Sequence, residues 1–258
     1  MMKGKLVYLL GTMTLSLSII GFLLAILSAS AATPSITSNT AWIDNFDNTT
    51  LNGRWSWVRE DPTHWDLTSQ PGYLHLVTKG SLFQTSNNLQ NILTTPANGD
   101  NFQLITRVTI SPTENYQSAG LLVYQDDDNY IEVSRVYNNG GKVRIRSEVG
   151  GATTSIYVDE IIETVYLRID KEADRYLGFY SLDGNNWTHI GQYTVTLTSP
   201  YIGITAGNQP TMAEVNAYFN FVQYTPVEYN YAAFRIFRIF FAMYRLGYPN
   251  SIAYEYGL

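Results

Sequence analysis

Seven side chains in the middle of the chain have the types that bind a sugar. Tyrosine rings stack on the C–H faces of a pyranose, while guanidinium and carboxylate groups hydrogen-bond its hydroxyls. We therefore predict a carbohydrate-binding surface if the chain gathers them on one face, and the alternative is a solvated face with cross-strand ion pairs. The seven residues are Tyr130, Glu132, Arg144, Arg146, Tyr166, Arg168 and Tyr180.

Alternating strands must position these side chains. Residues 118–148 read as three strands, with a break at 126–128 and an Asn-Asn-Gly-Gly turn at 138–141 that favours a tight hairpin. In 129–137, Ile131 and Val133 fall on one face while Tyr130 and Glu132 fall on the other. The segments 142–148, 165–171 and 175–181 repeat this division, so we expect all seven residues outside the core on one shared polar face.

Short strands with frequent turn signals fill the rest of the chain up to residue 226, which is typical of a sandwich or barrel. No helical pattern of useful length precedes Tyr229, and this excludes a parallel βαβ sheet. We expect the first strand, with Trp42 and Phe46, to pair with the last. The inner face of that last strand is predicted to carry Val215, Ala217, Phe219 and Phe221.

Composition narrows the class of protein. The 258 residues carry a net charge of −6, contain no cysteine, and are 14% aromatic and only 15% charged. The acidic balance argues against a nucleic-acid partner, and the lack of cysteine excludes disulfides and thiolate metal sites. This composition fits an extracytoplasmic all-β protein.

The two ends differ from the middle. Residues 1–32 combine Lys3 and Lys5, an apolar run over 6–27 and small residues at 29–32, which indicates a signal peptide or an N-terminal membrane anchor. Residues 33–40 read as a linker. Residues 227–258 form a tail with a possible amphipathic helix over 232–246. We expect a secreted or cell-surface protein, with possible membrane contact through the N-terminal segment or the tail.

Three stretches carry a family resemblance. They are Trp55–Pro62 (WSWVREDP), Ser118–Asp127 (SAGLLVYQDD) followed by Asn129-Tyr130, and the hairpin Ser181–Trp187 (SLDGNNW). Over residues 41–226 the chain resembles the concanavalin A-like domain at the C-terminus of family 43 β-xylosidases. The resemblance implies an all-β, two-sheet antiparallel jelly-roll sandwich with one concave sheet. In those enzymes the domain accompanies a catalytic propeller, which the printed sequence lacks, so we carry over no catalytic residue.

Three functions remain open. The first is an exported, non-catalytic carbohydrate-binding domain that recognises a polysaccharide through its concave sheet. The second is a glycoside hydrolase, which needs two carboxyl groups roughly 5–10 Å apart. Glu132, Glu148 and Asp170 are candidates, but residues 132–135 (EVSR) do not match the Glu-x-Asp-x-x-Glu strand signature of jelly-roll glucanases. The third is a surface adhesion domain that binds protein.

We predict no cofactor and no catalytic metal. A structural Ca²⁺ is possible where Asp44, Asp47 and Asn220 meet near the pairing of first and last strands, and a second acidic cluster spans 126–128. The three histidines have no metal-ligand spacing, so we predict structural roles for them. They are His64, His75 and His189.

Overall fold

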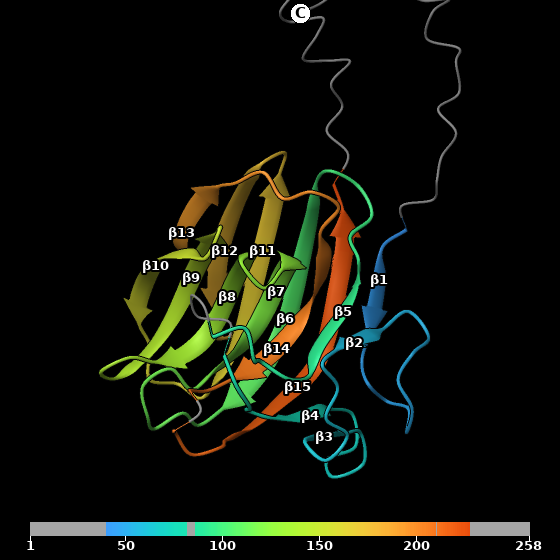
Figure 1. Ribbon diagram of the computed structural model, residues 1–258. Helices are drawn as coiled ribbons and strands as arrows, with labels where there is room; N and C mark the ends of the chain where they lie inside the picture. Colours follow the sequence, from blue (N-terminus) through green and yellow to red (C-terminus); the bar gives the residue numbers. More distant parts are fainter. Residues whose placement is uncertain (1–39, 82–85, 210, 228–258) are drawn as a thin grey trace, which may run out of the picture. The chain divides into compact units, whose positions relative to one another are not determined.

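The computed structural model describes residues 40–81, 86–209 and 211–227 (Figure 1). Within these ranges all regular secondary structure is β-strand. The described residues contain no helix that is long and apolar enough to cross a bilayer. The strands are β1 (Trp42–Asp44), β2 (Ser56–Val58), β3 (Trp65–Asp66), β4 (Leu74–Val77), β5 (Ile92–Pro96), β6 (Phe102–Ile110), β7 (Ser118–Asp126), β8 (Asn129–Tyr137), β9 (Gly141–Val149), β10 (Ala152–Asp159), β11 (Thr164–Glu172), β12 (Arg175–Ser181), β13 (Thr188–Thr194), β14 (Tyr201–Gly207) and β15 (Asn216–Pro226).

The strands form two antiparallel sheets that stack on one another (Figure 1). The 8-stranded sheet has the order β13-β12-β11-β6-β15-β4-β3, with β1 paired to β15, and the 7-stranded sheet has the order β10-β9-β8-β7-β14-β5-β2. Trp42 lies opposite Tyr224 in the β1–β15 pair, which confirms the predicted pairing of first and last strands. The all-β sandwich is likewise confirmed.

Alternation along each strand builds the core between the sheets. In β6 every second residue from Phe102 to Ile110 is buried, and these side chains meet inward residues of the other sheet such as Ile131 and Ile145. One prediction for the last strand was wrong. A register shift between Phe219 and Phe221 turns Phe221 out of the core, and the next inward position is filled by the buried Val222.

A crossing between the sheets follows the central meander. Strands β7 to β10 are neighbours in the 7-stranded sheet, whereas β11 to β13 belong to the 8-stranded sheet. The chain changes sheet over residues 160–163, between β10 and β11. Strands that look alike in the sequence therefore present their polar faces on opposite sides of the sandwich.

The outer face of the 7-stranded sheet is partly covered. A second apolar cluster on this face joins Ile92, Leu122, Tyr124 and Tyr130 of the sheet to Leu89. Leu89 belongs to a connection over residues 78–91, described except for 82–85, which we call the cover segment. Arg59 holds it in place, since its Nε donates to the Leu89 carbonyl at 2.6 Å.

Candidate functional site

The structure separates the seven predicted binding residues. Four lie on the outer face of the 7-stranded sheet, two on the outer face of the 8-stranded sheet, and Tyr180 packs against the core between them. The prediction of one shared face was therefore wrong. Parity was right within β8, β9 and β11, but parity carries no information about which sheet a strand joins. Strand β12 has Tyr180 opposite the buried Leu167, so its two tyrosines, Tyr176 and Tyr180, have the inward parity and Phe179 has the outward one.

The four residues on the 7-stranded sheet are buried, not solvated. Their exposed fractions are 0% for Tyr130, 6% for Glu132, 2% for Arg144 and 5% for Arg146. They line a cavity of about 30 Å³ beneath the cover segment, which has room for about two water molecules. Its other lining residues are Gly80, Ser81, Leu89, Tyr116, Ser118, Leu122, Thr205, Gly207 and Asn208.

A buried ion pair crosses the cavity wall. Arg144 Nη2 lies 2.8 Å from Glu132 Oε1 and 2.9 Å from Oε2, and Arg146 Nη1 lies 3.8 Å from Oε2. Burial alone would raise the pKa of Glu132, but the two guanidinium groups outweigh it and lower the pKa below its ordinary value. Glu132 is thus held as a carboxylate. The alternative hypothesis of cross-strand ion pairs on a solvated face is thus correct about the ion pair, but the pair is buried.

Tyrosine and glutamate form a second contact on the same wall. The Tyr130 hydroxyl donates to Glu148 Oε2 at 2.9 Å, and burial raises the pKa of this tyrosine. The hydroxyl is engaged and the ring is fully buried. Tyr130 therefore supports the wall of the cavity and cannot serve as a stacking platform for a sugar.

Two polar atoms of the cavity wall have no hydrogen-bond partner among the described residues. They are Nε of Arg144 and Oγ1 of Thr205. A buried donor without a partner costs about 1–3 kcal/mol, so a ligand hydroxyl or a water molecule that reaches it gains that much. No sequence pattern pointed to Thr205, because it lies in β14, far along the chain from β8 and β9.

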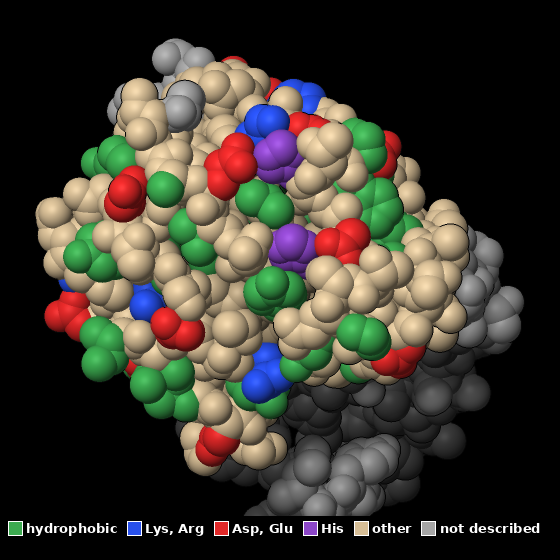
Figure 2. Space-filling view, turned by 90° about the horizontal axis from the view of Figure 1, so that it is seen from below, with side chains coloured by type: hydrophobic (Ala, Val, Ile, Leu, Met, Phe, Trp, Pro, Cys, Tyr) green, Lys and Arg blue, Asp and Glu red, His purple; other side chains and the backbone are tan. Residues whose placement is uncertain are grey.

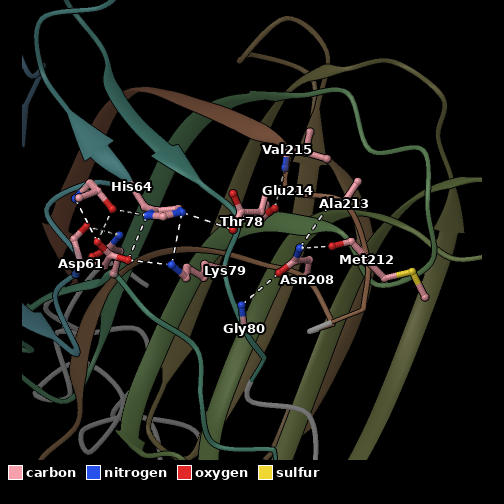
Figure 3. A network of polar contacts seen from close by, with 12 residues as sticks. Asp61, His64, Thr78, Lys79, Gly80, Asn208, Met212, Ala213, Glu214 and Val215 are labelled. Atoms are coloured by element: carbon pink, nitrogen blue, oxygen red, sulfur yellow. Dashed lines mark hydrogen bonds and ion pairs between the residues drawn. The ribbon is translucent and has the colours of Figure 1, made fainter.

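Side-chain hydrogen bonds close one end of the cavity. Asn208 Oδ1 accepts from the backbone N–H of Gly80 at 3.0 Å, and its amide nitrogen donates to the carbonyls of Met212 and Ala213 at 3.1 Å each (Figure 3). Thr78 Oγ1 accepts from the backbone N–H of Val215 at 2.8 Å. These bonds anchor the cover segment to the residues that precede β15. Asn208 carried no motif in the sequence.

The same network contains a charged cluster. His64 lies 3.0 Å from Asp61 Oδ2 and 3.3 Å from Glu214 Oε1, while Lys79 Nζ lies 2.9 Å from Asp61 Oδ2 (Figure 3). Hydrogen bonds from Thr63 and Lys79 lower the pKa of Asp61. Figure 2 shows two histidines at the surface of one face of the molecule. These contacts agree with the structural role predicted for His64.

Two of the predicted calcium ligands, Asp44 and Asn220, make hydrogen bonds within the protein. Asp44 accepts from the backbone N–H of Phe46 at 3.0 Å and from Trp55 Nε1 at 2.8 Å, and Asn220 donates its amide to Gly72. In the second cluster Asp127 pairs with Arg59 at 2.8 Å. Within residues 40–81, 86–209 and 211–227, no group of three or more His, Cys, Asp or Glu side chains could hold a metal ion. The structural Ca²⁺ stays a prediction.

The 8-stranded sheet carries the other two predicted residues on a more open face. The guanidinium carbon of Arg168 lies 4.1 Å from the ring centre of Phe179 and 4.8 Å from that of Trp187, which is cation–π geometry. Its Nη2 also pairs with Asp170 Oδ2 at 3.0 Å. Burial raises the pKa of Asp170 despite this pair. Tyr166 lies beside these groups, two residues earlier in β11.

The comparisons with known proteins agree with the all-β sandwich fold. The family model of the β-xylosidase C-terminal concanavalin A-like domain matches residues 43–225. A putative β-xylosidase of Escherichia coli is 31% identical over 175 residues, which are 63% of this chain and 32% of that protein. A non-reducing end α-L-arabinofuranosidase of Bacteroides ovatus is 32% identical over 103 residues, which are 39% of this chain and 19% of that protein.

Solved structures support the fold. The GH43 protein BlXynB of Bacillus licheniformis superposes with a TM-score of 0.67 at 22% identity, covering 72% of this chain and 39% of that one. The chain spans about a third or less of the curated relatives it matches. The family match covers most of the sandwich. This chain therefore belongs to the family of β-xylosidase C-terminal concanavalin A-like domains.

Proposed function

We propose that this domain binds a polysaccharide without cleaving it, at the cavity on the outer face of the 7-stranded sheet. The observation that carries the proposal is the pair of buried, unpartnered polar atoms, Arg144 Nε and Thr205 Oγ1, in the cavity wall. Together with the Glu132 carboxylate they offer a donor, a hydroxyl and an acceptor within one small cavity. This is the set that a sugar hydroxyl can satisfy.

The size of the cavity limits what enters it. About 30 Å³ accommodates a hydroxyl group but not a pyranose ring. The ring would lie at the mouth, where Ser81 and Tyr116 are partly exposed. The relatives are named as β-xylosidases and an arabinofuranosidase, so we take pentose-containing polysaccharides as the first ligands to test.

Glu132 argues for binding over cleavage. A glycosidase acid must carry a proton near its working pH, and enzymes achieve this by raising a carboxyl pKa. In this cavity Arg144 and Arg146 lower the pKa of Glu132 instead. The export signal predicted for residues 1–32 would bring such a domain to extracellular polysaccharide.

Affinity electrophoresis and calorimetry with xylan, arabinoxylan, cellulose, mannan and chitin test the proposal. We expect one of these to bind, and Thr205→Val to weaken its affinity by about fivefold to tenfold, because one ligand hydrogen bond worth about 1 kcal/mol is lost. Thr106→Val is the matched control, since its buried hydroxyl donates to the Phe221 carbonyl at 2.6 Å, remote from the cavity lining. The proposal is refuted if none of these glycans binds, or if Thr205→Val and Thr106→Val bind the glycan equally well.

A further inference from the structure

A second arginine on the outer face of the 8-stranded sheet lies among aromatic side chains. Arg107 of β6 is opposite Tyr166 of β11 on one side and Phe221 of β15 on the other. Its guanidinium carbon lies 5.8 Å from the centre of the Tyr166 ring, and its Nη1 donates to the Tyr73 hydroxyl at 3.3 Å. All four side chains are partly exposed.

The charge of Arg107 is not balanced locally. No salt bridge joins it to a carboxylate among the described residues, and its cross-strand neighbours are aromatic. Arg168 and Arg175 in the same sheet each have a carboxylate partner, Asp170 and Glu172 respectively. A protein of net charge −6 thus presents a positive charge framed by rings.

The backbone holds the Tyr166 ring in place. A Cβ on Gly184 would lie 3.1 Å from the ring, so the hairpin between β12 and β13 packs directly against it. Asp183 fixes that hairpin, since its Oδ1 accepts from the backbone N–H groups of Asn185 and Asn186 at 2.8 Å each. The ring and the guanidinium are therefore preorganised, which reduces the entropic cost of binding.

We infer that Arg107, Tyr166 and Phe221 bind a uronic acid residue of an acidic polysaccharide. The planar guanidinium matches a carboxylate in a bidentate pair, and the flanking rings suit the C–H face of the sugar. The rings favour a uronate over an acidic peptide, whose carboxylates sit on flexible side chains without a flat face. This binding surface lies on the sheet opposite the cavity and does not depend on it.

Titration of the full chain with tri-galacturonate, xylotriose and tetraglutamate tests the inference at low and high salt. We expect tri-galacturonate to bind more tightly than the other two, and high salt to weaken its binding. Arg107→Gln should reduce its affinity by about tenfold to a hundredfold, and Arg107→Lys by less, because lysine keeps the charge but loses the bidentate geometry.

Arg175→Gln is the matched control, because it removes the same charge from β12, where the 47% exposed Arg175 side chain pairs with Glu172. It should leave the affinity unchanged, and so should Thr205→Val in the cavity. The inference fails if tri-galacturonate does not bind, if xylotriose or tetraglutamate binds equally well, or if Arg175→Gln weakens binding as much as Arg107→Gln. Thr205→Val tests the cavity proposal and not this inference. If Thr205→Val weakens the binding of a glycan at the cavity while tri-galacturonate does not bind, only the present inference is refuted.

Discussion

Two arginine–carboxylate pairs, one on each outer face of the sandwich, have similar distances but different surroundings, and the pKa of the carboxyl group shifts in opposite directions. Arg144 lies 2.8 Å from Glu132, and Arg168 lies 3.0 Å from Asp170. The first pair is almost fully buried and the second is partly exposed. Yet the pKa is lowered for Glu132 and raised for Asp170. Burial raises the pKa of both carboxyls, but near Glu132 the guanidinium groups of Arg144 and Arg146 together outweigh this effect, whereas the pair with Arg168 does not outweigh it at Asp170.

The largest effect should come from breaking the buried pair. Arg144→Met leaves the Glu132 carboxylate buried beside only the more distant Arg146, and we expect a loss of about 3–5 kcal/mol in the free energy of unfolding. Urea denaturation measures it. The double variant Arg144→Met/Glu132→Leu should recover much of the loss, because no buried charge is then left unpaired. If Arg144→Met lowered the free energy of unfolding by less than about 1 kcal/mol, the Glu132 carboxylate would not be buried without a close partner in that variant.

Removing the anchor of the cover segment should have the next largest effect. Asn208→Ala deletes the acceptor of the Gly80 N–H and the donor to two carbonyls, and we expect a loss of about 1–3 kcal/mol. Hydrogen exchange should accelerate at Gly80 and at neighbouring amides of the cover segment. Uniform acceleration across β8 and β9 would instead indicate global destabilisation, and unchanged exchange at Gly80 would show that Asn208 does not hold the segment.

The pH dependence of stability should distinguish the two carboxylates. Because the folded pKa of Glu132 is lowered, its contribution to stability is complete above its ordinary pKa of 4.5 and is lost as the pH falls through the folded pKa. Asp170 has the opposite sign, since its raised pKa makes the folded state less stable as the pH rises through it. Urea melts between pH 3 and 7 should show a shallower acid loss in Glu132→Gln and a steeper one in Asp170→Asn.

The exposed pair should matter much less than the buried one. Arg168→Met removes a partly exposed ion pair and leaves the aliphatic stem packed near Phe179, so we expect a loss of about 1 kcal/mol or less. The same urea assay used for Arg144→Met measures it. If Arg144→Met and Arg168→Met lowered the free energy of unfolding equally, burial would not distinguish the ion pairs of the two faces.

The smallest change in stability should come from Thr205. Its hydroxyl is buried without a partner, so replacing it with a methyl group in Thr205→Val should leave the unfolding free energy unchanged or raise it by up to about 1 kcal/mol. Thr106→Val, which removes a bonded hydroxyl, should lower it by about 1 kcal/mol. A marked loss in Thr205→Val would mean that this hydroxyl has a partner in solution.

Alternation in the sequence predicted the strands that carry the candidate residues but not the relation between the two polar faces. Alternation and turn residues are local, and they located β8, β9 and β11 within a residue or so at each end. The change of sheet between β10 and β11 takes only residues 160–163, a length that also suits a hairpin. Nothing in that short stretch indicates that Tyr166 and Arg168 will lie on the other side of the sandwich from Tyr130.

Burial of the cavity residues was equally hidden. Tyr130, Glu132, Arg144 and Arg146 have the alternation of a solvated face, and the cover segment that buries them precedes them by about 40 residues or more. Such long-range coverage leaves no local pattern. Thr205 and Asn208 could not be predicted for the same reason, since only the pairing of β14 with β7 brings them to the cavity.

The pairing of β1 with β15 determines how the domain responds to mechanical tension. Trp42, at the start of β1, lies opposite Tyr224, near the end of β15, so a pull on both ends of the domain loads this antiparallel pair one hydrogen bond at a time. A three-residue strand opened in this way resists little force, whereas β15 stays clamped between β6 and β4. Under tension, β1 would detach from β15 before any other strand, and the rest of the sandwich would stay folded.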